Sequence, residues 1–378
     1  MKKSMIALLT ASMMAGQYAH AQEAAATQPS WADTVEFKGD VRFRLEQIDE
    51  DGKDTRDRAR IRARLGAEAD ISDEISAGIA LASGNDDPVS SNQTLTDSFS
   101  SKDIKLDLAY IDLHPEAIGD GNIVLGKMKM PFIAVNDLQW DGDLNPEGAA
   151  VKYTIGVSDT ISLLVNGGGF WLEERSNDDE TMLYGGQAAL QLKEKDFSVL
   201  GGASYFYYDN IDGVTPLVDA EDGFGNDLTE VEDIDEVTGE VVSTEYFYAN
   251  GFEVLELFAK LGFNAGLPVE FAGNYVANQD ADEDDTGYML GLKLGKLKKK
   301  GSLEFGYSYR ELEANAVVGA FADSDAWNGG TDGKSHKFNL GYQLADSLSA
   351  GLTYFISEKG LDDGTDYNRI QIDLVTKF

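Results

Sequence analysis

The chain has 378 residues, a formal net charge of −36 and no cysteine. So large a negative charge argues against a nucleic-acid partner, because phosphates would be repelled over most of the surface. After the N-terminal stretch, no segment offers 18 apolar residues in a row, which excludes helical membrane spans.

The N-terminus has the three-part pattern of a secretory signal. Lys2 and Lys3 precede an apolar stretch over residues 5–14, and Ala-His-Ala at 19–21 supplies a small-x-small cleavage site. The apolar stretch is too short to span a bilayer as a helix, so we expect cleavage before Gln22. The predicted divisions are a signal peptide, a short N-terminal segment and one strand-rich domain, residues 1–21, 22–34 and 35–378.

Alternation of apolar and polar residues dominates the rest of the chain, as in residues 105–113 and 337–344. This period of two indicates strands with two unlike faces. About sixteen such segments occur, centred near 41, 64, 79, 108, 125, 151, 165, 187, 202, 258, 274, 291, 306, 339, 352 and 373. Short and long connections alternate between them. The sequence therefore predicts an all-β fold, a transmembrane antiparallel β-barrel of about 16 strands with short periplasmic turns and long extracellular loops.

A soluble β-sandwich is the rival fold, because its strands also alternate. Strands in soluble sheets are usually about 5–6 residues long. Many alternating segments here are longer and reach the roughly 9–11 residues that a tilted strand needs to cross a bilayer. Tyrosines such as Tyr205, Tyr275 and Tyr354 recur near strand ends, as in the aromatic girdles of membrane barrels. The chain also ends in Phe378, which resembles the C-terminal signature of Gram-negative outer-membrane proteins and predicts that location.

Residues 57–68 place arginine at every second position, with small apolar residues between. Each arginine facing lipid at the bilayer midplane would cost roughly 2–4 kcal/mol. The apolar side is therefore expected to meet lipid and the arginines the interior. That interior has to hold water, because unpaired guanidiniums cannot be buried dry. A preceding strand continues the theme, and the predicted pore-lining residues are Arg42, Arg44, Arg58, Arg60, Arg62 and Arg64.

Several segments resemble the putative porin family of Gram-negative bacteria. The resemblance is densest over residues 37–156 and includes RARIRARLG (58–66), LDLAYIDLHP (106–115) and LQWDGDLNPEGAA (138–150). It implies a general diffusion channel for small hydrophilic solutes in the outer membrane, in contact with lipid and lipopolysaccharide, and a homotrimer as in many porins.

In sixteen-stranded porins, the loop at the place of residues 131–150 folds inward and narrows the channel. By that resemblance, acidic side chains of this segment oppose the arginines and form the constriction: Asp137, Asp141, Asp143 and Glu147. The electric field between these carboxylates and the arginines, together with the narrowed channel, would select solutes by charge and size. The alternative is an exposed acidic loop. The preference between anions and cations stays open, because the acidic loops would enrich cations at the mouth.

Two other classes of function remain. The long acidic segment 210–243 carries no Lys or Arg, so the barrel could instead serve as an adhesin or surface scaffold. An integral enzyme would need His114 or His336 beside a partner, but the predicted topology puts them at opposite ends of the barrel. The sequence thus predicts no catalytic residue, no cofactor and no metal site.

Overall fold

The computed structural model describes residues 34–378 except 97, 177–178, 236, 239 and 363. The predicted signal peptide and nearly all of the segment 22–34 lie outside the described residues. The first half of the chain forms the following strands: β1 (Glu36–Glu50), β2 (Arg56–Ser72), β3 (Ile75–Ser83), β4 (Gln93–Thr94), β5 (Ile104–Leu113), β6 (Gly121–Lys127), β7 (Glu147–Gly156), β8 (Ile161–Glu173), β9 (Thr181–Lys193) and β10 (Phe197–Asp209).

The second half continues the same sheet after one extra hairpin. Its strands are β11 (Leu228–Ile234), β12 (Val241–Tyr248), β13 (Phe252–Asn264), β14 (Pro268–Asn278), β15 (Thr286–Gly295), β16 (Leu303–Leu312), β17 (Gly333–Ala345), β18 (Leu348–Lys359) and β19 (Thr365–Lys377). Two 3₁₀ helices are described, Glu116–Ile118 and Gly319–Phe321. Neither described helix is long or apolar enough to traverse a bilayer.

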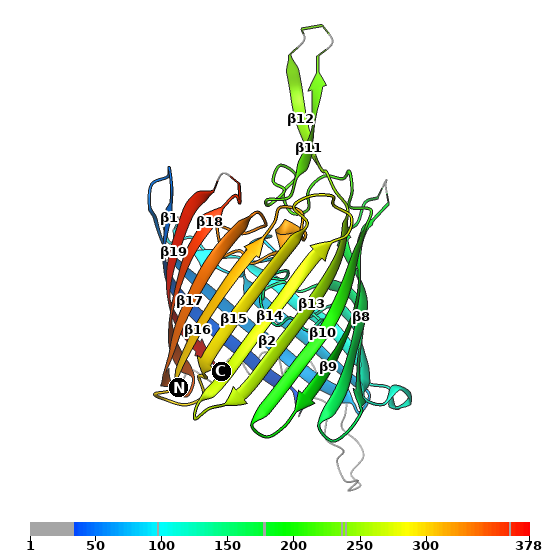
Figure 1. Cartoon of the computed structure of the whole chain (residues 1–378), viewed down its shortest axis with the longest axis vertical. Coiled ribbons are helices and arrows are strands. Elements are labelled where there is room, and N and C mark those ends of the chain that lie inside the picture. Colours follow the sequence, from blue (N-terminus) through cyan, green and yellow to red (C-terminus); the bar gives the residue numbers. More distant parts are fainter. Residues whose placement is uncertain (1–33, 97, 177–178, 236, 239, 363) are drawn as a thin grey trace, which may run out of the picture.

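Each strand pairs antiparallel with its neighbour, and β1 pairs with β19, which closes the sheet into a barrel (Figure 1). The two-residue β4 pairs with the upper part of β2, and β11 and β12 pair only with each other. The other sixteen strands form the wall, and every predicted centre falls within one of them. The predicted closed, sixteen-stranded fold is confirmed, since the two ends of the sheet leave no open edge.

The connections sort by length onto the two ends of the barrel. Residues 73–74 and 346–347 are among the short turns, whereas 84–103, 128–146, 210–251 and 313–332 are the longest connections. Figure 1 shows the β11–β12 hairpin projecting beyond the long-loop rim, away from the C-terminus. By the length rule for outer-membrane barrels, the long loops are extracellular.

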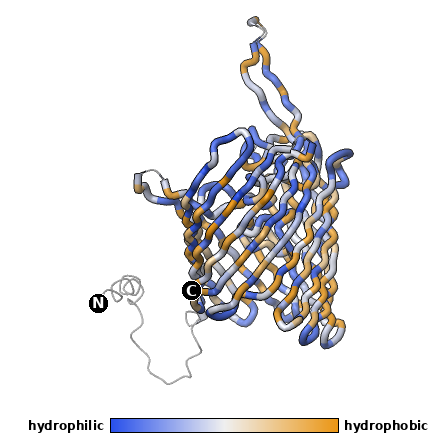
Figure 2. The backbone as a smooth tube through the Cα atoms, turned by 60° about the vertical axis from the view of Figure 1, so that its left-hand side comes forward, coloured by the Kyte–Doolittle hydropathy of each residue, from blue (hydrophilic) through white to orange (hydrophobic). Residues whose placement is uncertain are grey.

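Hydrophobic and hydrophilic residues alternate along the strands (Figure 2). Successive side chains of a strand point to opposite faces, so this alternation gives the wall an apolar outer face and a polar inner face. On β1, the outward Val41, Phe43 and Leu45 are 41–48% exposed, whereas the inward Arg44 and Glu46 are buried. In a membrane barrel, such outward residues meet acyl chains.

Candidate functional site

The two arginine-bearing strands lie side by side in the wall. In the β1–β2 register, Arg42 is opposite Arg62 and Arg44 is opposite Arg60. The apolar residues between them share the outer parity of Leu65, which is 50% exposed. The inward side chains of Arg58, Arg60, Arg62 and Arg64 are only 11–27% exposed, because inward-folded loops cover them.

Carboxylates neutralise most of this row, contrary to the expectation of unpaired guanidiniums. The first group lies within the two strands. Arg62 and Arg64 both contact Asp40, at 2.8 and 2.7 Å. Arg58 Nε donates to Glu46 Oε1 at 2.6 Å. The premise that these guanidiniums are bare was therefore wrong, and the arginine row by itself does not require a water-filled bore.

A second set of ion pairs joins the row to β19. Arg44 forms a two-pronged contact with Asp373, with Nε–Oδ1 and Nη2–Oδ2 distances of 2.7 and 2.8 Å. Arg369 Nε donates to Glu46 Oε2 at 2.7 Å. Sequence reasoning missed Arg369, although its inward parity in the final strand could have indicated it.

The connection 128–146 folds into the barrel and is tied to the far wall. Gln187 on β9 bonds both the N–H and the carbonyl of Ile133, at 2.7 and 3.0 Å. Asn136 Nδ2 donates to Asn274 Oδ1 on β14 at 2.8 Å. The loop therefore crosses the bore.

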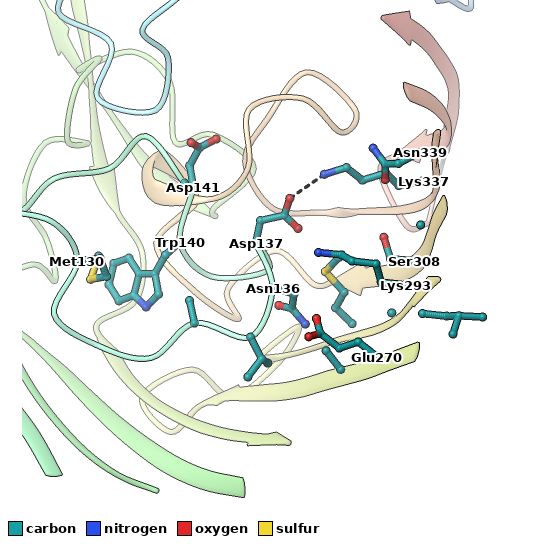
Figure 3. Close-up of a pocket in the computed structure, with 18 of the residues that line it drawn as sticks. Met130, Asn136, Asp137, Trp140, Asp141, Glu270, Lys293, Ser308, Lys337 and Asn339 are labelled. Carbon is teal, nitrogen blue, oxygen red and sulfur yellow. Dashed lines mark hydrogen bonds and ion pairs between the residues drawn. The ribbon is translucent and has the colours of Figure 1, made fainter. Parts of the chain in front are cut away.

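Asp137 anchors the loop to β16 and β17. It contacts Lys337 Nζ at 2.8 Å and Arg310 Nη2 at 3.2 Å, and Figure 3 shows the Asp137–Lys337 contact reaching from loop to wall. Burial alone would raise the pKa of Asp137, but the charges of Arg310 and Lys337 outweigh burial and lower it. Asp137 thus faces cations, although they are not the arginines of β1 and β2.

Asp143 is the predicted loop carboxylate that meets the arginine row. Its Oδ1 lies 3.2 Å from Arg64 Nη1 and 3.8 Å from Arg62 Nη1. Its Oδ2 accepts from the Ser91 hydroxyl at 2.8 Å, so the connection 84–103 also folds inward here.

Asp141 and Glu147 lie elsewhere. Asp141 Oδ2 accepts the Ser324 N–H at 3.1 Å, and no ion pair of Asp141 occurs among the described residues. Burial, followed by the negative charge of Asp323, raises the pKa of Asp141 to about 8. Glu147 is the first residue of β7 and pairs with Lys127 of β6 at 2.8 Å, so the structure does not bring it to the arginines. The connection itself runs from 128 to 146 instead of the predicted 131–150.

A further inward loop, residues 313–332, was not foreseen. Its Asp325 contacts Arg369 at 2.9 Å and Arg44 at 3.3 Å, and its Asp323 pairs with Arg310. The available signal was a loop with four acidic residues, Asp323 and Asp325 among them, and no Lys or Arg. This loop lies between the connection 128–146 and the β16–β1 part of the wall.

An apolar cluster joins the inward loops to the upper strands. Trp140 and Phe321, one from each loop, stack with ring centroids 6.2 Å apart, and Phe206 of β10 meets Trp140 edge-on at 5.2 Å. Leu138 and Phe206 have no exposed surface. The loops are therefore packed against the inner wall and not merely hydrogen-bonded to it.

Open space remains beside the connection 128–146. A cavity of about 600 Å³ lies between it and β14–β17, and Lys293, Glu270 and Asn339 are among its lining residues (Figure 3). Another of about 700 Å³ is lined by Asp40, Arg64 and others. Lys129 and Gly142 line both cavities, so both spaces border the same loop.

Neither histidine among the described residues has a catalytic pair of side chains beside it. His114 contacts Ser76 at 3.3 Å and Asp112 at 3.8 Å, with its side chain 39% exposed. His336 Nδ1 lies 3.0 Å from the Tyr307 hydroxyl. Within the part of the chain that the structure describes, no group of three or more His, Cys, Asp or Glu side chains could hold a metal ion.

A closed sixteen-stranded barrel with an inward-folded, charged loop defines an outer-membrane channel. The model of the family described as Putative porin matches residues 47–230 and 227–378. The chain belongs to that family, which comprises channels of the outer membrane and not enzymes. A search of curated proteins found no match.

Solved structures show the same fold at low identity. Salmonella typhi OmpF, in complex with daunomycin, aligns with a TM-score of 0.54 and 12% identity over 91% of this chain and 97% of its own. A mutant of Rh. blastica porin aligns with a TM-score of 0.52 and 12% identity, over 91% of this chain and 100% of its own. A loop-deletion mutant of OmpT from Vibrio cholerae aligns with a TM-score of 0.51 and 15% identity, over 91% of this chain and 99% of its own.

Proposed function

We propose that the protein lets small hydrophilic solutes diffuse through the outer membrane, with selectivity set where Asp143 faces Arg62 and Arg64. The Asp143–Arg64 contact of 3.2 Å carries this proposal, because it places a pair of opposite charges beside the open space along an inward loop. The cavities bordering that loop give solutes room on either side of it. Charged groups this close to a narrow passage act on an ion before bulk water screens them.

Planar-bilayer recording of the purified protein under a salt gradient tests the proposal. Discrete open steps are expected, and the sign of the reversal potential gives the ion preference. Barrels that insert without conductance would refute the proposal.

Insertion without conductance would favour a second role, surface binding through the acidic loops. The observation that favours this role is the β11–β12 hairpin, which projects beyond the rim (Figure 1) and carries exposed acidic residues. The apolar cluster around Trp140 also narrows the bore. The two roles separate in the same recording.

We also infer that the mature chain, after loss of residues 1–21, assembles as a homotrimer in contact with lipid and lipopolysaccharide. The outward positions of β2 and β3 support this, because they hold small or aliphatic side chains in place of the tyrosines found on β10 and β14–β18: Ala59, Ile61, Ala63, Leu65, Ala67, Ala69, Ile71, Ile75, Ala77, Ile79 and Leu81. Small side chains let two sheets approach closely. Sedimentation in detergent measures the assembly, and a monomer would refute it.

A further inference from the structure

Four arginines form a square on the inner face of β1 and β2. Arg42 faces Arg62 and Arg44 faces Arg60, so Arg42 and Arg60 occupy one diagonal and Arg44 and Arg62 the other. Diagonal neighbours of this kind lie roughly 7–8 Å apart. Arg44 and Arg62 are both engaged in the ion pairs described above.

The other diagonal lacks comparable partners. Arg42 Nη2 donates to the neutral amide of Asn92 at 2.5 Å, and no ion pair of Arg42 occurs among the described residues. Arg60 reaches only Glu46 Oε1, at 4.0 Å, and that oxygen already accepts from Arg58. The Nε atoms of Arg42 and Arg60 are both buried without a hydrogen-bond partner. Two cations therefore have donors to spare in a place where every neighbouring arginine is neutralised.

We propose that Arg42 and Arg60 form a binding site for a small oxyanion: a carboxylate, phosphate or sulfate group. The planar guanidinium fork can donate two parallel hydrogen bonds to the oxygens of such an oxyanion, and two forks on one diagonal can share it. The anion would also relieve repulsion among the four clustered cations. Since the site lies on the inner wall, this inference rests on the proposed channel function and gives it a solute class.

In the part of the chain that the structure describes, the nearby carboxylates of the inward loops are held by other groups and do not form ion pairs with Arg42 or Arg60. Asp87, in the connection 84–103, is half-buried near Arg60, but its Oδ1 accepts the Val89 N–H at 3.0 Å and it forms no ion pair with Arg60. Asp325 is held by Arg44 and Arg369. The side chain of Arg60 keeps 13% of its surface exposed, so a solute in the bore can reach it.

Sulfate is a suitable probe, with chloride as the reference anion. Titration calorimetry of the folded protein in detergent is expected to show saturable binding of sodium sulfate. In planar bilayers bathed in potassium chloride, added sulfate is expected to reduce the chloride current with the same concentration dependence. Sodium succinate tests whether a carboxylate binds the same site.

Variants assign the site. Arg42→Gln with Arg60→Gln is expected to weaken sulfate binding by about tenfold or more, because both charged forks are lost. Arg42→Lys with Arg60→Lys keeps the positive charges but loses the guanidinium forks. Its affinity for sulfate should lie between that of the glutamine variant and that of the natural protein. The matched control, Lys129→Gln with Lys293→Gln, removes two lumen cations elsewhere and should keep saturable binding.

Equal weakening in the lysine-to-glutamine control would show a general charge effect and overturn the site. Absence of saturable sulfate binding in the natural protein would overturn it as well. Neither result touches the proposed channel, which fails only if the inserted protein does not conduct.

Discussion

The contact of Asp137 with Lys337 and Arg310 should hold the inward loop against the wall, and Asp137→Asn tests this directly. The amide keeps the shape of the side chain but removes its charge. It leaves Lys337, at 2.8 Å, and Arg310, at 3.2 Å, without this carboxylate.

The size of the effect follows from burial. Removing one partner of a fully buried ion pair costs about 3–5 kcal/mol. Here the Asp137 side chain is 30% exposed, and Asp323 remains 3.9 Å from Lys337 and in contact with Arg310. We therefore expect a loss of about 1–2 kcal/mol in the tether. Since about 1.4 kcal/mol changes an equilibrium constant tenfold, the displaced state of the loop should become roughly 5–30 times more populated.

Single-channel recording measures this loop motion. Displacement of the loop should appear as more frequent current fluctuations and a larger mean conductance. Glu147→Gln is the control, because it removes one carboxylate near the base of the same loop while breaking only a partly exposed pair with Lys127. If Asp137→Asn and Glu147→Gln gave the same quiet current as the natural protein, the tether would not restrain the loop.

Three further changes have defined outcomes. Arg62→Gln with Arg64→Gln leaves nearby carboxylates without their cations, so the reversal potential should move toward cation preference, and an unchanged potential would place selectivity elsewhere. The pKa of Asp141 is raised, so the neutral form favours the folded loop. The stabilisation of the folded loop should be complete at a pH below the ordinary carboxyl pKa and should be lost as the pH rises to about 8. The channel current should therefore change over this pH range, and Asp141→Asn should abolish that change. At the seam of the barrel, Gly39→Val would put Cβ 2.6 Å from the Phe378 ring, so electrophoresis of unheated samples should show less folded barrel than in the natural protein.

The strands of the barrel wall could be predicted because the pattern that each strand needs is contained in its own consecutive residues. A strand with lipid on one side and polar groups on the other has to alternate, and the alternation is visible in the residues themselves. The inward direction of the arginines in β2 followed from the cost of exposing charge to lipid. In the structure, the inward Arg62 and Arg64 contact Asp143 of an inward loop, and Arg64 also contacts Asp40 of the neighbouring strand.

The interior could not be predicted in the same way, because loops have no period. Residues 313–332 alternate in no regular manner, yet they place Asp323 and Asp325 beside Arg310, Arg44 and Arg369. Those contacts join parts of the chain that are far apart in sequence. The projecting β11–β12 hairpin was likewise read only as an acidic connection, since most residues of its two strands are exposed and impose no alternating pattern.

The arginines of one row thus divide by the contacts they make. Arg44 and Asp373 are opposite each other across the β1–β19 pairing that closes the barrel, and Arg369 bonds Glu46 across the same seam. Removing one member of such a buried pair leaves a charge unpaired at the point of closure. Among the residues that the structure describes, Arg42 and Arg60 have no comparable carboxylate, so their removal costs the fold little and should alter mainly what the bore attracts. Side chains that look equivalent along the sequence therefore separate into those that close the wall and those left free to meet a solute.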